Sequence, residues 1–178
     1  MTAKLSETDK PALDLLFSSA YEELKRLANT VRAGSPNDSL NPTALVNESY
    51  IKLAKSLRIV PQSRLHFKRI AARAMRQVLV EAARRRGAEK RGGGQAFVTF
   101  DEGLDGADRS PEELVALDLA LKDLARVNAR QASVVECRFF GGLDLVEIAA
   151  LLEVSETTVQ RDWRVAKAWL GSELRREV

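Results

Sequence analysis

Apolar residues recur with helical spacing in three stretches of the first half of the chain. The first, residues 12–31, stops before a Gly-Ser-Pro sequence at 34–36, which favours the end of a helix. The second, residues 41–60, begins with Asn-Pro, where Asn can cap a helix and Pro fits the first turn. The third and longest covers residues 63–90. Together they predict three helices in one bundle.

Residues 92–109 interrupt this pattern, because they open with three glycines and are rich in acids. Helical spacing resumes after Ser110, which Pro and then Glu follow in the pattern of a capping box. Another helix, 129–140, ends at a Gly-Gly pair. Strand-like alternation is nearly absent. We therefore predict an all-α protein of two small helical domains, 1–91 and 110–178, joined by a Gly-rich acidic linker that few contacts cross.

The last forty residues have the spacing of a helix-turn-helix motif. Asp144 and Ser155 are each placed to cap a helix, and residues 153–154 form a tight turn between the two helices. Small Ala149 lets the helices cross closely, and Val159 falls on the inner side of the second helix. We therefore predict that this half of the chain binds DNA.

The second helix of this motif has two distinct sides at about 100° per residue. The side predicted to face the core carries Val159, Trp163, Ala166 and Leu170. The opposite side carries Thr157, Gln160, Arg161 and Arg164. In a major groove, Arg can bind guanine, Gln can bind adenine and Thr can contact the thymine methyl group. We expect this strip to bind the base edges of DNA. The alternative is that it is only a solvent-exposed face of the helix without a binding role.

Positive charge is concentrated in one segment. Residues 64–91 hold ten Lys and Arg against two acids, so this segment carries +8 in a chain whose net charge is +3. The rest of the chain is therefore mildly acidic. This distribution is typical of a basic surface that binds an anionic polymer, and the alternative is a solvated basic helix face.

The composition argues against catalysis and against membrane insertion. His66 is the only histidine, which leaves little for a His-based metal site or a Ser-His-Asp triad. Cys137 is the only cysteine, so it excludes an internal disulfide, and we expect it to be buried. No apolar run approaches the roughly 20 residues of a membrane span, and no signal peptide opens the sequence. We expect a cytoplasmic protein that is not an enzyme and has no cofactor or metal.

Three segments resemble one known family, the ECF (extracytoplasmic-function) sigma factors. The stretch DLVEIAALLEVSETTVQRDWRVAKAWL resembles their promoter-binding C-terminal domain. The basic stretch HFKRIAARAMRQVLVEAARRRGAEKRGGG is similar to their N-terminal domain, and TALVNESYIKLA to their polymerase-docking helix. The three matches follow the family's order over nearly the whole chain.

The resemblance implies a subunit that binds core RNA polymerase and directs promoter-specific initiation of transcription. It places polymerase-binding residues at Leu45, Glu48, Tyr50 and Ile51. Residues for the single-stranded downstream promoter element would be Arg69, Arg73, Arg76, Gln77, Arg84, Arg85 and Arg86. Residues for the duplex upstream element would be Thr157, Thr158, Gln160, Arg161, Arg164 and Lys167. The partners implied are core RNA polymerase, promoter DNA and an anti-sigma factor or other regulator.

The sequence departs from the family in two respects. Many members have Asn where Arg73 stands, and the aromatic row that helps to melt DNA is missing, since His66 and Phe67 are the only rings nearby. We therefore expect a factor that opens only well-matched promoters. The alternative function is a stand-alone helix-turn-helix regulator with its own operator. Such a regulator would need a dimer interface or a ligand pocket in its first ninety residues. This sequence has a basic helix there instead.

Overall fold

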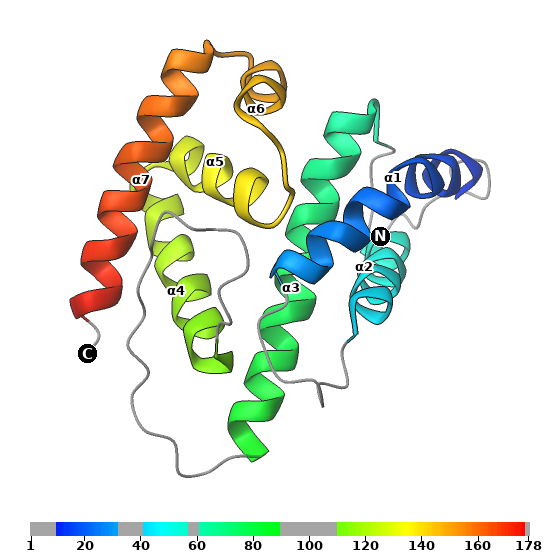
Figure 1. Cartoon of the computed structure of the whole chain (residues 1–178), viewed down its shortest axis with the longest axis horizontal. Coiled ribbons are helices and arrows are strands. Elements are labelled where there is room, and N and C mark those ends of the chain that lie inside the picture. Colours follow the sequence, from blue (N-terminus) through cyan, green and yellow to red (C-terminus); the bar gives the residue numbers. More distant parts are fainter. Residues whose placement is uncertain (1–9, 32–40, 57–60, 90–109, 177–178) are drawn as a thin grey trace, which may run out of the picture.

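The computed structural model describes residues 10–31, 41–56, 61–89 and 110–176. These residues form helices without any strand, which confirms the all-α prediction (Figure 1). The helices are α1 (Lys10–Val31), α2 (Pro42–Ser56), α3 (Arg64–Glu89), α4 (Pro111–Val127), α5 (Ala129–Phe139), α6 (Leu145–Leu152) and α7 (Glu156–Arg176). Within the described ranges, none of them is long and apolar enough to cross a bilayer. The predicted stop at 34–36 and the predicted linker at 92–109 lie outside the described residues.

The first three helices pack together as predicted, with α1 and α2 on one side of α3 (Figure 1). Their contact buries Leu13 of α1, Leu45 of α2 and Phe67 of α3 completely. The predicted cap of α2 is present, because the Asn41 side chain accepts a hydrogen bond of 2.7 Å from the backbone N–H of Ala44. The start of α2 therefore follows from a local sequence signal.

The second half forms its own group of helices, α4 to α7, on the other side of α3 (Figure 1). The capping box at Ser110 is confirmed, since its hydroxyl accepts from the backbone of Glu113 while the Glu113 carboxylate accepts from the backbone of Ser110. After α5, Gly142 has a φ of +61°, a left-handed conformation that favours glycine. Asp144 then caps α6 with a second capping box.

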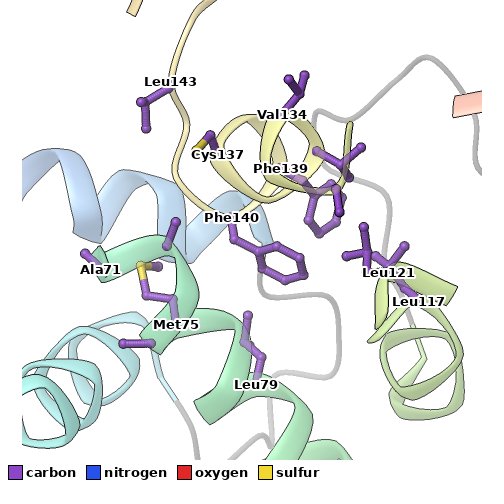
Figure 2. Close-up of a cluster of buried hydrophobic side chains, with 14 of the residues drawn as sticks. Ala71, Met75, Leu79, Leu117, Leu121, Val134, Cys137, Phe139, Phe140 and Leu143 are labelled. Carbon is purple, nitrogen blue, oxygen red and sulfur yellow. The ribbon is translucent and has the colours of Figure 1, made fainter. Parts of the chain in front are cut away.

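The two groups of helices share one hydrophobic core, with α3 between them. Phe140, at the end of α5, lies between Met75 and Leu79 of α3 and Leu121 of α4 (Figure 2). The chain also approaches α3 closely at Gly141, where an added Cβ would lie 3.0 Å from the Cβ of Ala72 and 2.5 Å from the carbonyl oxygen of Cys137.

This packing differs from the expectation that few contacts cross between the halves. The reason lies in α3, whose buried residues occupy more than one side of the helix. Ala72 and Ala74 are both buried although they are two positions apart and so lie on nearly opposite sides of the helix, and Met75 and Leu79 face Phe140 (Figure 2). A helix that is apolar on several sides can serve two groups of helices at once. The boundary between the two domains stays a prediction.

Cys137 is buried in α5, as expected. Burial raises the pKa of its thiol to about 11, so it is protonated at neutral pH. We predict that the folded protein reacts with a thiol reagent such as DTNB far more slowly than the urea-unfolded protein, because the thiolate is the nucleophile. Absorbance during labelling measures both rates. Equal rates in the two states would contradict the burial of this side chain.

Candidate nucleic-acid interface

Helices α6 and α7 form the predicted helix-turn-helix. The turn is closed by a hydrogen bond of 3.1 Å from the backbone N–H of Val154 to the carbonyl oxygen of Ala149. Glu153 adopts a left-handed conformation, with a φ of 55°, and this residue ends α6. Ser155 then caps α7, since its hydroxyl accepts from the backbone N–H of Thr158 at 3.2 Å. The turn and both predicted caps are therefore confirmed.

Helix α7 has the two sides predicted from its sequence. Its buried residues include Val159, Trp163, Ala166 and Leu170. Its exposed residues include Thr157, Gln160, Arg161 and Arg164. Thr158 and Lys167 are half-buried. The Thr158 hydroxyl lies 2.8 Å from the Ser155 hydroxyl, so this side chain supports the cap.

Two contacts from α5 fix the rotation of α7. The carboxylate of Asp162 is buried and accepts hydrogen bonds of 2.5 and 3.3 Å from Arg130. Arg138 places its guanidinium 4.7 Å from the centre of the Trp163 ring. Asp162 and Trp163 are neighbours in the chain, so both contacts hold the same turn of α7. We expect them to orient the exposed strip on the opposite side of the helix.

The candidate residues on α3 fall into two groups by exposure. Those that are exposed are Arg69, Arg73, Gln77, Arg84 and Arg85. The first three are four residues apart, so they form a single stripe along the helix. Arg86 is half-buried, and the side chain of Arg76 is only 12% exposed. The stripe is open to solvent, while Arg76 faces the second half of the protein.

Arg76 forms ion pairs with carboxylates of α4 and α5. Its guanidinium lies 2.9 Å from Asp118 and 2.7 Å from Glu136. Arg84 also reaches Asp118, at 3.2 Å. The resemblance assigned Arg76 to the DNA-binding face, but in this structure carboxylates of the protein hold its guanidinium.

Lys68 forms a second ionic contact between the halves, which was not predicted. Its ammonium lies 2.8 Å from Glu147 of α6 and 2.9 Å from Glu23 of α1. Burial opposes its charge, but these hydrogen bonds outweigh burial and raise the pKa of Lys68. The hydrogen bond from Lys68 is also the main cause of the lowered pKa of Glu23. Its partners are far away in sequence, so no local pattern could have revealed this contact.

The candidate polymerase-binding residues of α2 differ in their surroundings. Leu45 is fully buried, so it supports the bundle core. Tyr50 is half-buried and its hydroxyl donates to Asp14, a hydrogen bond that, together with burial, raises the pKa of Tyr50 to about 12. Glu48 and Ile51 are exposed, Ile51 by 49%. These last two form the part of the candidate docking site that a partner can reach.

The comparisons with known proteins point to one family. The profile of the ECF sigma factor family matches residues 2–176. A search of curated proteins and a search of solved structures gave no match. The match to the family profile covers both groups of helices, including the helix-turn-helix and the basic helix α3. The chain therefore belongs to the ECF sigma factor family, which is not a family of enzymes and whose role is promoter-directed transcription.

Proposed function

We propose that this protein binds core RNA polymerase and directs it to promoters through two DNA-contacting helices, α3 and α7. The observation that carries the proposal is the exposed strip of Thr, Gln and Arg on α7. It lies directly after a helix-turn-helix turn, and the opposite side of the same helix is buried in the core. This is the arrangement of a recognition helix that enters the major groove.

The strip on α7 offers chemistry for reading a duplex upstream element. Arg161 and Arg164 can each bind guanine through two hydrogen bonds, while Gln160 can bind adenine and Thr157 can contact a thymine methyl group. Thr158 takes part in the cap, so we assign it a supporting role. Lys167 is half-buried and lies 5.5 Å from the centre of the Trp163 ring, at the edge of the proposed interface.

The stripe on α3 offers contacts to the single-stranded downstream element. Arg69 and Arg73 can bind phosphates, and Gln77 can hydrogen-bond to a base edge. Phe67 is completely buried, so it cannot stack on an unpaired base, and this leaves His66 as the accessible ring near the stripe. With few rings to hold flipped bases, α3 suits promoters that match both elements well.

Co-purification with core RNA polymerase tests this proposal. We expect the chain to co-elute with core polymerase in size-exclusion chromatography and to support transcription from a matched promoter. Ile51→Glu should weaken co-elution, because it places a charge on the exposed apolar part of α2. Val127→Glu is the matched control, since Val127 is 73% exposed but lies on α4.

A stand-alone regulator would behave differently in the same experiment. It would bind a duplex operator tightly without polymerase and would not co-elute with it. That result would replace the proposed function by the alternative.

Substitutions on α7 test the specificity assigned to the strip. We predict that Arg161→Ala or Arg164→Ala weakens binding to the matched upstream element by about 1–3 kcal/mol, with little effect on unrelated DNA. Arg175→Ala serves as the control, because Arg175 is exposed near the far end of the same helix. Fluorescence anisotropy with matched and scrambled duplexes measures these affinities. Equal losses for all three variants on every duplex would contradict the assignment.

A further inference from the structure

One large apolar side chain, Val165, lies on the exposed face of α7. Val165 is 47% exposed, whereas Val159, Leu170 and Leu174 of the same helix are buried. Val has a lower helix propensity than Arg, Lys or Gln, so an exposed Val does not favour the helix itself. Neither helix formation nor burial within the described part of the chain therefore accounts for an apolar side chain at this position.

Val165 lies next to the arginines of the strip that we propose binds DNA. At about 100° per residue, it is about 40° from Arg161 around the helix and about 160° from the buried Trp163. It follows Arg161 by one helical turn and comes directly after Arg164, and all three of these side chains are exposed. A duplex that binds the two arginines would therefore also lie close to Val165.

The major groove of DNA offers one apolar group to such a side chain. Guanine, adenine and cytosine present hydrogen-bond donors and acceptors there, while thymine adds a 5-methyl group. The side chain of Val165 has no polar atom, so against the other bases it would leave donors or acceptors without a partner. Against thymine it can bury apolar surface on the methyl group. The chemistry of this position therefore favours thymine.

We propose that Val165 is a specificity-determining residue that selects a thymine in the upstream element through the 5-methyl group of that base. The inference rests on the proposed function of α7 and names one base that this helix binds. One helical turn rises about 5.4 Å, and neighbouring base pairs are about 3.4 Å apart. The thymine should therefore lie within about two base pairs of the guanine that Arg161 binds.

Thr157 also offers a methyl group to thymine, but to one in a different base pair. It precedes Val165 by eight residues, which is about 12 Å along the helix axis. This separation exceeds the rise of about 3.4 Å between neighbouring base pairs. A methyl contact of Thr157 and one of Val165 therefore fall on different thymines and can be measured separately.

Removal of single thymine methyl groups tests the inference. The probe is a fluorescein-labelled duplex with the sequence that the full chain selects from a random pool, and anisotropy measures its affinity. Deoxyuridine replaces each thymine in turn, because it pairs like thymine but lacks the 5-methyl group. For the unmodified chain, one such replacement should weaken binding about fourfold, the value of burying one methyl-sized group. The guanine of Arg161 is located as the one whose replacement no longer weakens binding by Arg161→Ala.

Three variants assign the methyl effect to a side chain. Val165→Ala should bind the thymine duplex and the deoxyuridine duplex equally well, because the apolar partner of the methyl group is gone. Val146→Ala is the matched control, since it is the same truncation at a Val that is 58% exposed on α6. It should retain the fourfold difference, as should Val165→Ile, which keeps a branched apolar side chain. Circular dichroism checks that all three variants retain their helix content.

The outcomes separate this inference from the function on which it rests. If no thymine near the Arg161 guanine is sensitive to loss of its methyl group, or if Val165→Ala retains that sensitivity, the inference is overturned and the proposed function stands. If Val165→Ala weakens binding to both duplexes and keeps the difference between them, or weakens co-elution with polymerase instead, Val165 contacts phosphates or protein and the inference also fails. A chain that selects no sequence, with Arg161→Ala lacking any effect, would overturn upstream-element recognition by α7 and this inference with it.

Discussion

Phe140→Ala should lower the free energy of unfolding by about 3–5 kcal/mol, because it removes a ring from the centre of the shared core. Phe140 is almost completely buried, and its ring lies between α3 and α4, next to Met75, Leu79 and Leu121 (Figure 2). The cavity left behind would weaken the contact between the two halves without changing any charge. Urea unfolding followed by circular dichroism measures the loss.

The control for this variant is Leu119→Ala on α4, because Leu119 is 42% exposed and its loss opens no cavity. We expect a change within about 0.5 kcal/mol, as for most surface substitutions. If Phe140→Ala were as mild as this control, the two halves would not be packed through Phe140 in solution.

Trp163→Ala should be as destabilising, by about 3–5 kcal/mol, but its effect should begin in the second half of the chain. Trp163 is buried on the inner side of α7 and also contacts Arg138. Small domains have only about 5–15 kcal/mol of stability, so α7 should lose its fixed position and upstream-element binding should disappear. Circular dichroism and DNA binding on the variant provide the measurement.

The same variant tests the predicted boundary between domains. If residues 1–91 form an independent domain, Trp163→Ala should still co-elute with core polymerase. Loss of co-elution would mean that the shared core makes the two halves one cooperative unit. Trp169→Ala is the control, since Trp169 is only partly buried at the edge of the core. A fully folded Trp163→Ala protein that no longer binds DNA would mean that the indole faces the groove.

The features that could be predicted from the sequence are those set by neighbouring residues. The caps at Ser110, Asp144 and Ser155 depend on side chains that bond to backbone three residues away. The inner side of α7, from Val159 to Leu170, follows from helical periodicity alone. Local chemistry therefore accounts for the starts of α4, α6 and α7 and for the inner side of the proposed recognition helix.

The arrangement around Arg76 could not be predicted in this way. Its partners, Asp118 and Glu136, are 42 and 60 positions away in the chain. Arg76 has the same basic character as Arg69 and Arg73, and nothing in its immediate neighbours marks it as a partner for carboxylates. Likewise, Leu45 lies on the candidate docking helix but is fully buried, because one helix supplies both core and surface residues. Tertiary packing decides which members of a basic or apolar stretch remain accessible.

The small residues of α3 have a consequence for how such a protein can evolve. The buried alanines of this helix are Ala71, Ala72, Ala74, Ala82 and Ala83. Neighbouring helices approach α3 on several sides, so a larger side chain at any of these positions would overpack the core. Exposed positions such as Arg69, Arg73 and Gln77 face no such limit. Sequence drift in α3 should therefore accumulate at these exposed positions, which we propose contact DNA, so that promoter preference can diverge while the helix packing stays fixed.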